Sequence, residues 1–329
     1  MSPSYSGSIL ITGGTAGLGY HCSLALAIKY PTHLITIASR SPGTPSAACV
    51  INKNLNQKNV QYIPLDLAST AQIRLFVQSW SQSNNPPITH LILNAGLQFP
   101  GEVGYTEDGF EQTFAINHIG HALLFHLLTP FLANDARIVL TASGTHDPAQ
   151  KTGVPDAVYT TAEELAHPST KTLNNPGRQR YSSSKLSTVL WTYALEKRLA
   201  ELRHGGSKNW TVAAFDPGLV PGTGLLRDAS STQRFLWSRV LPRVLPVLRA
   251  LISANIHTAE ESGASLAWLA AGGDAKVKGS TGKYYEGRTE IKSSVDSYHE
   301  GKQEDLWGWT VRNLAKSKEE AERFDLKVV

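Results

Sequence analysis

The sequence is poor in the features that mark several classes of protein. Only two cysteines, Cys22 and Cys49, occur in 329 residues, and their spacing offers neither a disulfide framework nor a metal site. No apolar run reaches the ~18 residues that span a bilayer, and the N-terminus lacks the basic segment and long apolar run of a signal peptide. We therefore expect a cytoplasmic protein without metal or integral membrane segment, with both cysteines buried in helices.

Acidic residues are absent from the first part of the chain. Residues 1–65 contain no Asp or Glu. Their charged side chains are those of Lys29, Arg40, Lys53 and Lys58. Over the whole chain the net charge is only +4, too small to imply a nucleic-acid partner. A composition of 41% hydrophobic and 18% charged residues is typical of a globular chain with a substantial core.

A strand, a glycine-rich turn and a helix follow one another near the start of the chain. An apolar strand runs from Ser8 to Thr12, and helical periodicity after the turn continues to about Tyr30. Glycines let the backbone approach a pyrophosphate, whose charge is met by the N–H groups and positive dipole of the helix start. The turn residues expected to contact such a cofactor are Gly13, Thr15, Gly17, Leu18 and Gly19.

The second predicted strand indicates which dinucleotide is bound. It runs from Leu34 to Ala38 and ends at Ser39-Arg40. An acidic residue near this point binds the ribose hydroxyls of NAD, whereas an Arg favours the extra phosphate of NADP. Since no acid lies within reach, we predict NADP(H), with Arg40 on its 2′-phosphate. The alternative is that Arg40 is a solvated loop residue.

Strands and helices continue to alternate along the chain. Further strands are expected at 60–64, 90–93, 137–141, 210–215 and 282–285. Helices are expected at 71–80, 110–132, 181–199 and 258–271. This order predicts an α/β chain that forms a single Rossmann-type domain, a doubly wound parallel sheet of about seven strands with helices on both faces.

Short polar or small-residue turns follow three of these strands, at the edge where such sheets bind ligands. They contain Asp66 and Leu67, then Asn94, Ala95 and Gly96, and finally Ser143. The first pair is expected beside the adenine. Position alone adds three candidates for contact with a substrate: Leu97, Phe99 and Thr145.

Asn117 is a candidate because it lies within the predicted helix from Phe110 to Leu132. An Asn competes with the helix backbone for hydrogen bonds and is mildly unfavourable there. His118 and His121 on the same helix are expected to be packing or surface residues and not metal ligands.

Tyr181 and Lys185 are four residues apart on one face of the next helix. A phenol titrates near ~10, and a fixed ammonium beside it stabilises its anion. The pair therefore predicts a tuned acid or base. Surface helices also contain this spacing by chance. It therefore indicates a catalytic pair only in combination with the other motifs.

Three further segments lie outside the predicted strands and helices of the sheet. The connection 144–180 contains a predicted helix at 161–166 and is either a lid or an ornamental insertion. Residues 217–256 are expected to form a substrate cap, although the basic amphipathic stretch 234–256 is also typical of peripheral contact with a membrane surface. Residues 287–329 are expected to form a helical tail.

Together these residues resemble the short-chain dehydrogenase/reductase superfamily from about Ser8 to Tyr285. The motifs occur in the expected order: Thr12-Gly13, Gly17, Gly19, Asn94-Ala95-Gly96, Asn117, Ser143, Tyr181, Lys185 and Pro217-Gly218. The run from Asn117 to His121 looks like the retinol-dehydrogenase-like enzymes. The residues that look like the protochlorophyllide-reductase-like branch are Pro217-Gly218, Thr223-Gly224-Leu225 and Arg227. Leu219 stands where that branch places Cys, which argues against its photochemistry here.

The resemblance implies a role for each residue. Tyr181 donates a proton to a carbonyl oxygen held by Ser143, Lys185 lowers the tyrosine pKa and binds the nicotinamide ribose, and Asn117 holds a water in a proton relay. The remaining implied cofactor contacts include Pro217, Gly218, Val220 and Thr223. The assembly that the resemblance implies is a homodimer or homotetramer.

We therefore expect an NADPH-dependent reductase of a ketone or aldehyde group on a bulky, largely hydrophobic small molecule. Two alternatives stay open. One is reduction of an activated C=C or C=N bond with the same cofactor, and the other is a protein that binds NADPH without turnover. The intact catalytic set argues against the second, since a binder needs only the glycine turn.

Overall fold

One eight-stranded sheet organises the part of the chain that the structure describes. The structure is a computed structural model and describes residues 5–226, 230–251 and 253–327. The strands are β1 (Ser8–Thr12), β2 (Leu34–Ser39), β3 (Val60–Pro64), β4 (Ile88–Leu93), β5 (Leu132–Thr141), β6 (Thr211–Asp216), β7 (Lys283–Glu286) and β8 (Thr289–Ile291). Their order is β3-β2-β1-β4-β5-β6-β7-β8, and all neighbours are parallel except β7 and β8. The predicted fold is confirmed, with one strand more than the sequence indicates.

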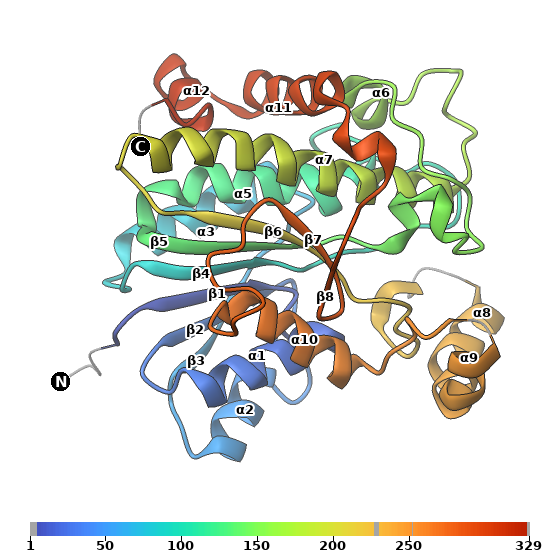
Figure 1. Ribbon diagram of the computed structural model, residues 1–329, viewed down its shortest axis with the longest axis horizontal. Helices are drawn as coiled ribbons and strands as arrows, with labels where there is room; N and C mark the ends of the chain where they lie inside the picture. The colour runs from blue at the N-terminus through green and yellow to red at the C-terminus, as the bar shows by residue number, and fades with distance from the viewer. Residues whose placement is uncertain (1–4, 227–229, 252, 328–329) are drawn as a thin grey trace.

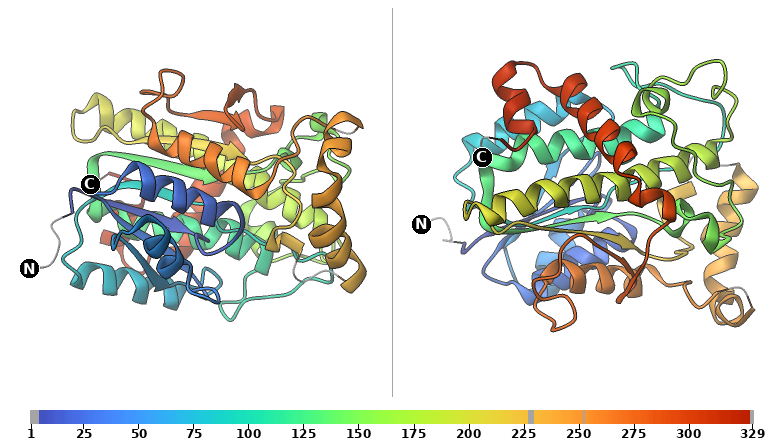
Figure 2. Two further views of the ribbon diagram at one scale, coloured as in Figure 1. Left: turned by 90° about the horizontal axis from the view of Figure 1, so that it is seen from below. Right: turned by 45° about the horizontal axis from the view of Figure 1, so that its top comes forward.

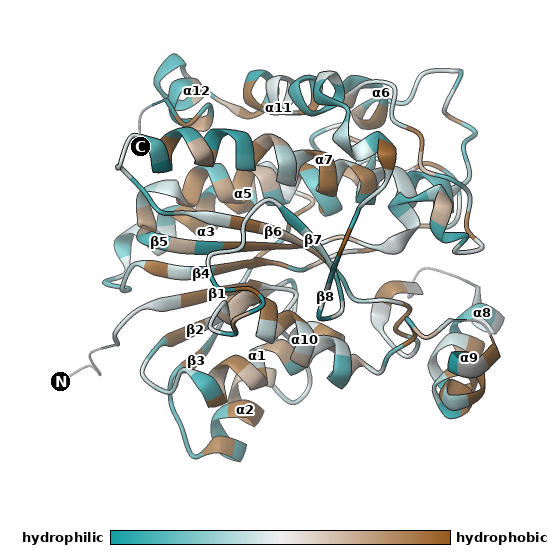
Figure 3. Ribbon diagram, viewed as in Figure 1, coloured by the Kyte–Doolittle hydropathy of each residue, from teal (hydrophilic) through white to brown (hydrophobic). Residues whose placement is uncertain are grey.

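Helices cover both faces of this sheet (Figure 1). One face carries α1 (Gly17–Lys29), α2 (Ala47–Leu55) and α10 (Ala259–Ala271). The other carries α3 (Thr70–Gln82), α5 (Gly120–Leu128) and α7 (Gly177–His204), with α11 (Glu300–Leu314) and α12 (Lys318–Phe324) outside them. Successive residues of β1 alternate between the two apolar layers, since Leu10 belongs to one and Ile9 and Ile11 to the other. Both faces are therefore buried, which explains the apolar strands in Figure 3.

The strand order creates a crevice at the carboxyl edge of the sheet. β1 pairs with β2 on one side and with β4 on the other. The loops that follow β1 and β4 leave the sheet toward opposite faces, and ligands bind at such a switch point. Helices α8 (Ser231–Phe235) and α9 (Leu245–Leu251) lie beyond this edge, at the end away from both termini (Figure 2).

The predicted helix from Phe110 to Leu132 is wrong in detail. A short helix, α4 (Gln112–Phe114), leads into a π-helical turn at Ala115–Ile119 before α5 begins, and β5 already starts at Leu132. Periodicity cannot separate these elements because all of them are apolar. Asn117 is at the centre of the π-helical turn, a feature that occurs frequently at functional sites.

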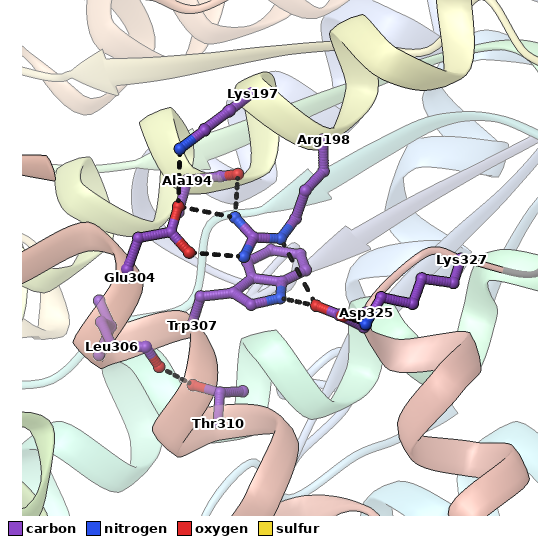
Figure 4. Close-up of polar contacts among 9 residues, drawn as sticks. All are labelled: Ala194, Lys197, Arg198, Glu304, Leu306, Trp307, Thr310, Asp325 and Lys327. Atoms are coloured by element: carbon purple, nitrogen blue, oxygen red, sulfur yellow. Dashed lines mark hydrogen bonds and ion pairs between the residues drawn. The ribbon is translucent and has the colours of Figure 1, made fainter. Parts of the chain in front are cut away.

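The C-terminal tail packs along α7, and Arg198 of that helix fastens it (Figure 4). The guanidinium lies 4.1 Å from the ring centroid of Trp307, bonds Glu304 at 2.8 Å and approaches Asp325 to 3.7 Å. Trp307 itself is buried and donates to Asp325. The tail thus begins with the strand β8, continues as the helices α11 and α12, and contributes to the core.

The two cysteines differ in their exposure. Cys22 is buried as predicted, but Cys49 is exposed on α2, because the buried face of that short helix is formed by other residues. Within the described residues, no group of three or more His, Cys, Asp or Glu side chains could hold a metal ion. Those residues also include no helix that is both long and apolar enough to cross a membrane.

Candidate active site

A cavity of about 1230 Å³ lies beyond the carboxyl ends of the parallel strands. Pockets for one drug-sized ligand are typically about 300–1,000 Å³, so this one has room for a dinucleotide and a second molecule. Most of the predicted site residues line it: Gly13, Thr15, Gly17, Leu18, Gly19, Arg40, Asp66, Leu67, Asn94, Ala95, Gly96, Leu97, Ser143, Thr145, Tyr181, Lys185, Pro217, Gly218, Val220 and Thr223. Phe99 and Asn117 do not.

The glycine turn after β1 is held against the loop after β4. The Thr12 hydroxyl accepts hydrogen bonds from the backbone N–H groups of Asn94 (2.9 Å) and Ala95 (3.0 Å). Gly13 has a φ of 69° and Gly17 a φ of 54°, values that favour glycine. The backbone thus follows the tight course that a pyrophosphate cradle needs.

The start of α1 can receive an anion. No acidic residue lies in its first turn, and no described side chain caps that turn. Its free N–H groups and positive dipole face the cavity through Gly17, Leu18 and Gly19. These residues fit the phosphates of a dinucleotide.

Gly19→Ala is expected to disrupt this cradle. A Cβ at Gly19 would lie 2.2 Å from the Gly13 carbonyl oxygen and 2.6 Å from Nδ2 of Asn94, so the backbone must move. We expect a loss of about 1–3 kcal/mol in the free energy of unfolding and at least about tenfold weaker dinucleotide binding. Gly224→Ala is the matched control, because Gly224 lines the same cavity and its Cβ would meet nothing within 4 Å. Urea unfolding and NADPH titration of both variants test this, and equal behaviour of the two would contradict it.

Arg40 follows β2 at the cavity wall and is exposed. The neighbouring Ser39 hydroxyl lies 2.9 Å from the Thr15 hydroxyl, which joins the end of β2 to the glycine turn. The nearest carboxylate in sequence that lines the cavity is Asp66, which follows β3. The guanidinium therefore stands at the edge where a ribose phosphate is expected.

Tyr181 and Lys185 are both buried in the first turns of α7 and line the cavity. The Lys185 ammonium lies 5.7 Å from the centroid of the Tyr181 ring and donates to the Thr141 carbonyl oxygen at 2.8 Å. Two of its three N–H bonds thus remain for other partners. The two side chains therefore lie on the same wall of the cavity.

Burial dominates the titration of this pair. It raises the pKa of the Tyr181 phenol; the hydrogen bond with Ser143 lowers that pKa, and the Asp216 carboxylate raises it. Burial also lowers the pKa of Lys185 to about 8, against the effect of Asp216. The lowered tyrosine pKa that the sequence predicts is therefore not found, because desolvation of the phenolate is the largest effect on this pKa. At neutral pH the phenol is protonated, the form that can donate a proton.

Ser143 follows β5 and begins a short 3-10 turn. Its hydroxyl accepts from the backbone N–H of Thr145 at 3.3 Å and is hydrogen-bonded to Tyr181. The hydroxyl of Thr145 is buried and has no hydrogen-bond partner among the described residues. The wall beside Tyr181 therefore has hydroxyl groups that can hold a polar atom of a ligand.

Asn117 acts on the loop after β4 and not on the cavity directly. Its Oδ1 accepts from the Leu97 N–H, and its Nδ2 donates to the Leu97 carbonyl, both at 2.9 Å. Nδ2 also donates to the Ser184 hydroxyl at 3.0 Å. The amide thereby fixes the loop to the π-helical turn and to α7, and the predicted water relay stays a prediction.

His121 has a role that the sequence did not reveal. It is buried, with Nδ1 3.2 Å from the carbonyl oxygen of Asn117 and Nε2 2.9 Å from the Thr12 hydroxyl. A carbonyl can only accept, so Nδ1 carries the proton. Burial lowers the pKa of His121 to about 4, so the neutral ring accepts at Nε2 from Thr12. One network therefore ties the glycine turn to the π-helical turn.

Other predictions for this region need correction or addition. Phe99 packs against the core instead of lining the cavity, because Gly177 at the start of α7 lies directly against its carbonyl. Asp216 and Trp237 line the cavity but were missed. The sequence could have indicated Asp216, because it lies at a strand end directly before Pro217-Gly218. Trp237 belongs to no motif that would have singled it out. Arg227 lies outside the described residues.

Comparisons with known proteins agree with this geometry. Residues 8–174, about half of the chain, match the family described as short chain dehydrogenase. Polyprenol dehydrogenase of Danio rerio is 33% identical over 225 residues, which cover 66% of this chain and 63% of that protein. Protochlorophyllide reductase, chloroplastic, of Pisum sativum is 30% identical over 278 residues, which cover 79% of this chain and 65% of that protein. The chain spans less than two thirds of each relative.

Solved structures share the fold at lower identity. The Pseudomonas aeruginosa RhlG/NADP active-site complex superposes with a TM-score of 0.58 at 21% identity, covering 86% of this chain and 96% of that one. A likeness at this identity supports the architecture of the sheet and its helices.

Proposed function

The chain belongs to the short-chain dehydrogenase/reductase superfamily, and on that premise we propose that it is an NADPH-dependent reductase of a carbonyl group on a bulky, largely apolar molecule. Members of this superfamily are oxidoreductases that bind a nicotinamide cofactor. The observation that carries the proposal is the buried phenol of Tyr181, hydrogen-bonded to Ser143 on the wall of a cavity large enough for two ligands.

The residues of the site would share the steps of this reaction among them. A bound NADPH supplies the hydride. The Tyr181 phenol gives its proton to the carbonyl oxygen as negative charge develops there, and the Ser143 hydroxyl holds that oxygen by a hydrogen bond. Lys185 binds the nicotinamide ribose with its remaining N–H bonds, and its positive charge stabilises the phenolate that is left. Asn117 and His121 are positioning residues, since they act through Leu97 and Thr12.

The lining of the cavity supports an apolar substrate. Away from the glycine turn its walls combine polar side chains with a set of large hydrophobic ones: Leu97, Ile116, Val154, Leu219, Leu225, Leu236, Trp237 and Leu241. Val154 comes from the connection 144–180, and the last five come from residues 217–256. We propose that the first segment is a lid over the substrate and the second a cap, whereas no described residue from 287 to 327 lines the cavity.

We expect Arg40→Ala to remove the preference for NADPH. Hydrogen bonds to a charged group contribute about 1.5–3 kcal/mol, so NADPH affinity should fall about ten- to hundredfold while NADH affinity stays nearly constant. Lys53→Ala is the control, because Lys53 is an exposed cation of the same acid-free segment that does not line the cavity. Fluorescence titration with both nucleotides decides this, and an unchanged ratio of affinities in Arg40→Ala would show that Arg40 is only a solvated residue.

The proposed reaction is tested by a substrate panel. Purified protein is mixed with NADPH and with long-chain aldehydes, bulky ketones, conjugated enones or cyclic imines, and NADPH consumption is followed. We expect the aldehydes and ketones to be consumed faster than the other classes, and apolar members faster than short polar ones. No turnover with any class, despite tight NADPH binding, would favour a binding protein instead.

Reduction of an activated C=C or C=N bond is the second candidate. It is favoured by the similarity to the pea protochlorophyllide reductase over 79% of the chain. Leu219, which lines the cavity, is not a proton donor, so it cannot protonate the carbon of such a bond. The homodimer or homotetramer and the cytoplasmic location remain predictions from the sequence.

A further inference from the structure

The segment from α8 to α9 exposes large apolar side chains to solvent. Phe235 is 60% exposed, Val247 55% and Leu251 80%, and Val240 and Val244 are also exposed. Exposed apolar side chains gathered on one short segment mark a contact surface more often than scattered ones. We call the exposed side of residues 231–251 the outer cap face.

These side chains lie on one side of a continuous helical path. Along the chain they are separated by five, four, three and four residues: Phe235, Val240, Val244, Val247 and Leu251. Steps of three and four keep side chains on one side of an α-helix, the geometry of Leu245–Leu251, which the 3-10 turn Leu241–Val244 precedes. The step of five coincides with the π-helical turn Leu236–Val240, which takes more residues per turn. The outer cap face is therefore a stripe of exposed apolar side chains along this segment.

The stripe is accompanied by positive charge alone. Arg239 and Arg243 are exposed beside it. The sequence from Ser230 to Ala259 contains no Asp or Glu. Arg243 donates to the backbone carbonyl of Arg239, whereas Arg249 donates to the Ile256 carbonyl and forms an ion pair with Glu261. The outer cap face is thus apolar and basic.

The inner side of the same segment closes the cavity. Leu236, Trp237 and Leu241 line it, and the Trp237 indole donates to the Thr223 carbonyl at 3.0 Å. Leu219, also on the cavity wall, is 43% exposed. An apolar molecule at the outer cap face would therefore be separated from the cavity by a single layer of helix.

We propose that the outer cap face docks on a bilayer that contains anionic lipids. Its apolar stripe would enter the boundary between headgroups and acyl chains, and Arg239 and Arg243 would meet the lipid phosphates and carboxylates. A second copy of the chain is a poorer occupant. A two-fold contact would bring these arginines toward each other, with no carboxylate in the segment to pair with them. This inference goes beyond the proposed reductase activity and does not depend on it.

Co-sedimentation of the full chain with vesicles tests the proposal, without cofactor or substrate. Vesicles of phosphatidylcholine alone are compared with mixtures of phosphatidylcholine and phosphatidylserine, at low and high salt. We expect at least about tenfold tighter binding to the mixed vesicles and a loss at high salt. Phe235→Ser/Leu251→Ser should weaken binding about tenfold or more, and Arg239→Gln/Arg243→Gln about tenfold to thirtyfold, since each such charge is worth about 1 kcal/mol near an anionic surface.

Two control variants show whether a loss of vesicle binding is specific to the outer cap face. Val295→Ser removes a side chain that is 91% exposed elsewhere, and Lys316→Gln/Lys318→Gln removes two exposed charges at the far end of the molecule. Neither should change binding. The arginine pair provides a second probe if the serine variant does not fold. Absence of binding to mixed vesicles, equal losses in the controls, or self-association abolished by the serine pair without lipid binding would each overturn the proposal.

Discussion

Tyr181→Phe is expected to lower kcat for carbonyl reduction by about 10²–10⁴-fold, the usual contribution of a positioned general acid. The variant keeps the ring that packs in the wall of α7 and removes only the hydroxyl that is hydrogen-bonded to Ser143. Affinity for NADPH should change little, because the cradle around Gly19 and Lys185 is intact. Steady-state kinetics and NADPH titration of the same preparation measure both quantities.

Tyr193→Phe provides the control for this substitution. Tyr193 lies on the same helix, but its hydroxyl bonds that of Ser293 at 2.6 Å and does not line the cavity. The control should keep normal kcat. Tyr181→Phe also distinguishes carbonyl reduction from C=N reduction, since hydride addition to a preformed iminium needs no proton from Tyr181. Substantial carbonyl turnover by Tyr181→Phe would refute the role given to the phenol.

The free energy of unfolding is expected to fall steeply as the pH drops from 6.5 toward 5. Burial lowers the pKa of His90 and His121 to about 4 and that of His118 and His126 to about 3. Their unfolded values lie near ~6.5, so stability is fully present above that pH and is lost as the unfolded chain takes up protons. Each histidine should contribute about 1 kcal/mol between pH 6.5 and 5.5. Urea unfolding at a series of pH values measures the sum.

The contribution of His126 to this pH dependence can be measured separately. Its ring stacks on Phe324 at 4.7 Å, and neither ring nitrogen has a hydrogen-bond partner within the described chain. His126→Phe should therefore fold, keep or increase stability at neutral pH, and reduce the slope with pH by about one proton. His204→Gln, at the exposed end of α7, should leave the slope unchanged. A flat unfolding free energy in the wild type would contradict the account of the buried histidines.

Much of the fold could be predicted because local signals and long-range packing agree. The glycine turn, the apolar runs of β1 and β2 and the turn Asn94-Ala95-Gly96 each point to a strand end at one edge of a parallel sheet. The cavity then follows from topology, since the carboxyl ends of parallel strands meet. Tyr181 and Lys185 fall at this edge because α7 begins there.

The features that were missed depend on contacts that no local pattern encodes. β8 is three residues long and mostly exposed, so it exists only because Thr289–Ile291 pairs with β7. The π-helical turn accompanies the bonds from Asn117 to Leu97, 20 residues earlier. His121 looked like a packing residue since its partner Thr12 is 109 residues away. The tyrosine pKa followed burial, which the spacing of Tyr181 and Lys185 cannot reveal.

Transfer of deuteride tests the central claim most directly. NADPH carrying deuterium at the reactive position of its nicotinamide is mixed with a bulky enone, which offers both a C=O and a C=C bond, and the product is analysed by mass spectrometry and NMR. The account predicts deuterium on the carbinol carbon, with transfer by Tyr181→Phe slower by about 10²–10⁴-fold. Deuterium on the former alkene carbon, with the carbonyl intact, would contradict the assignment of this site as a carbonyl reductase.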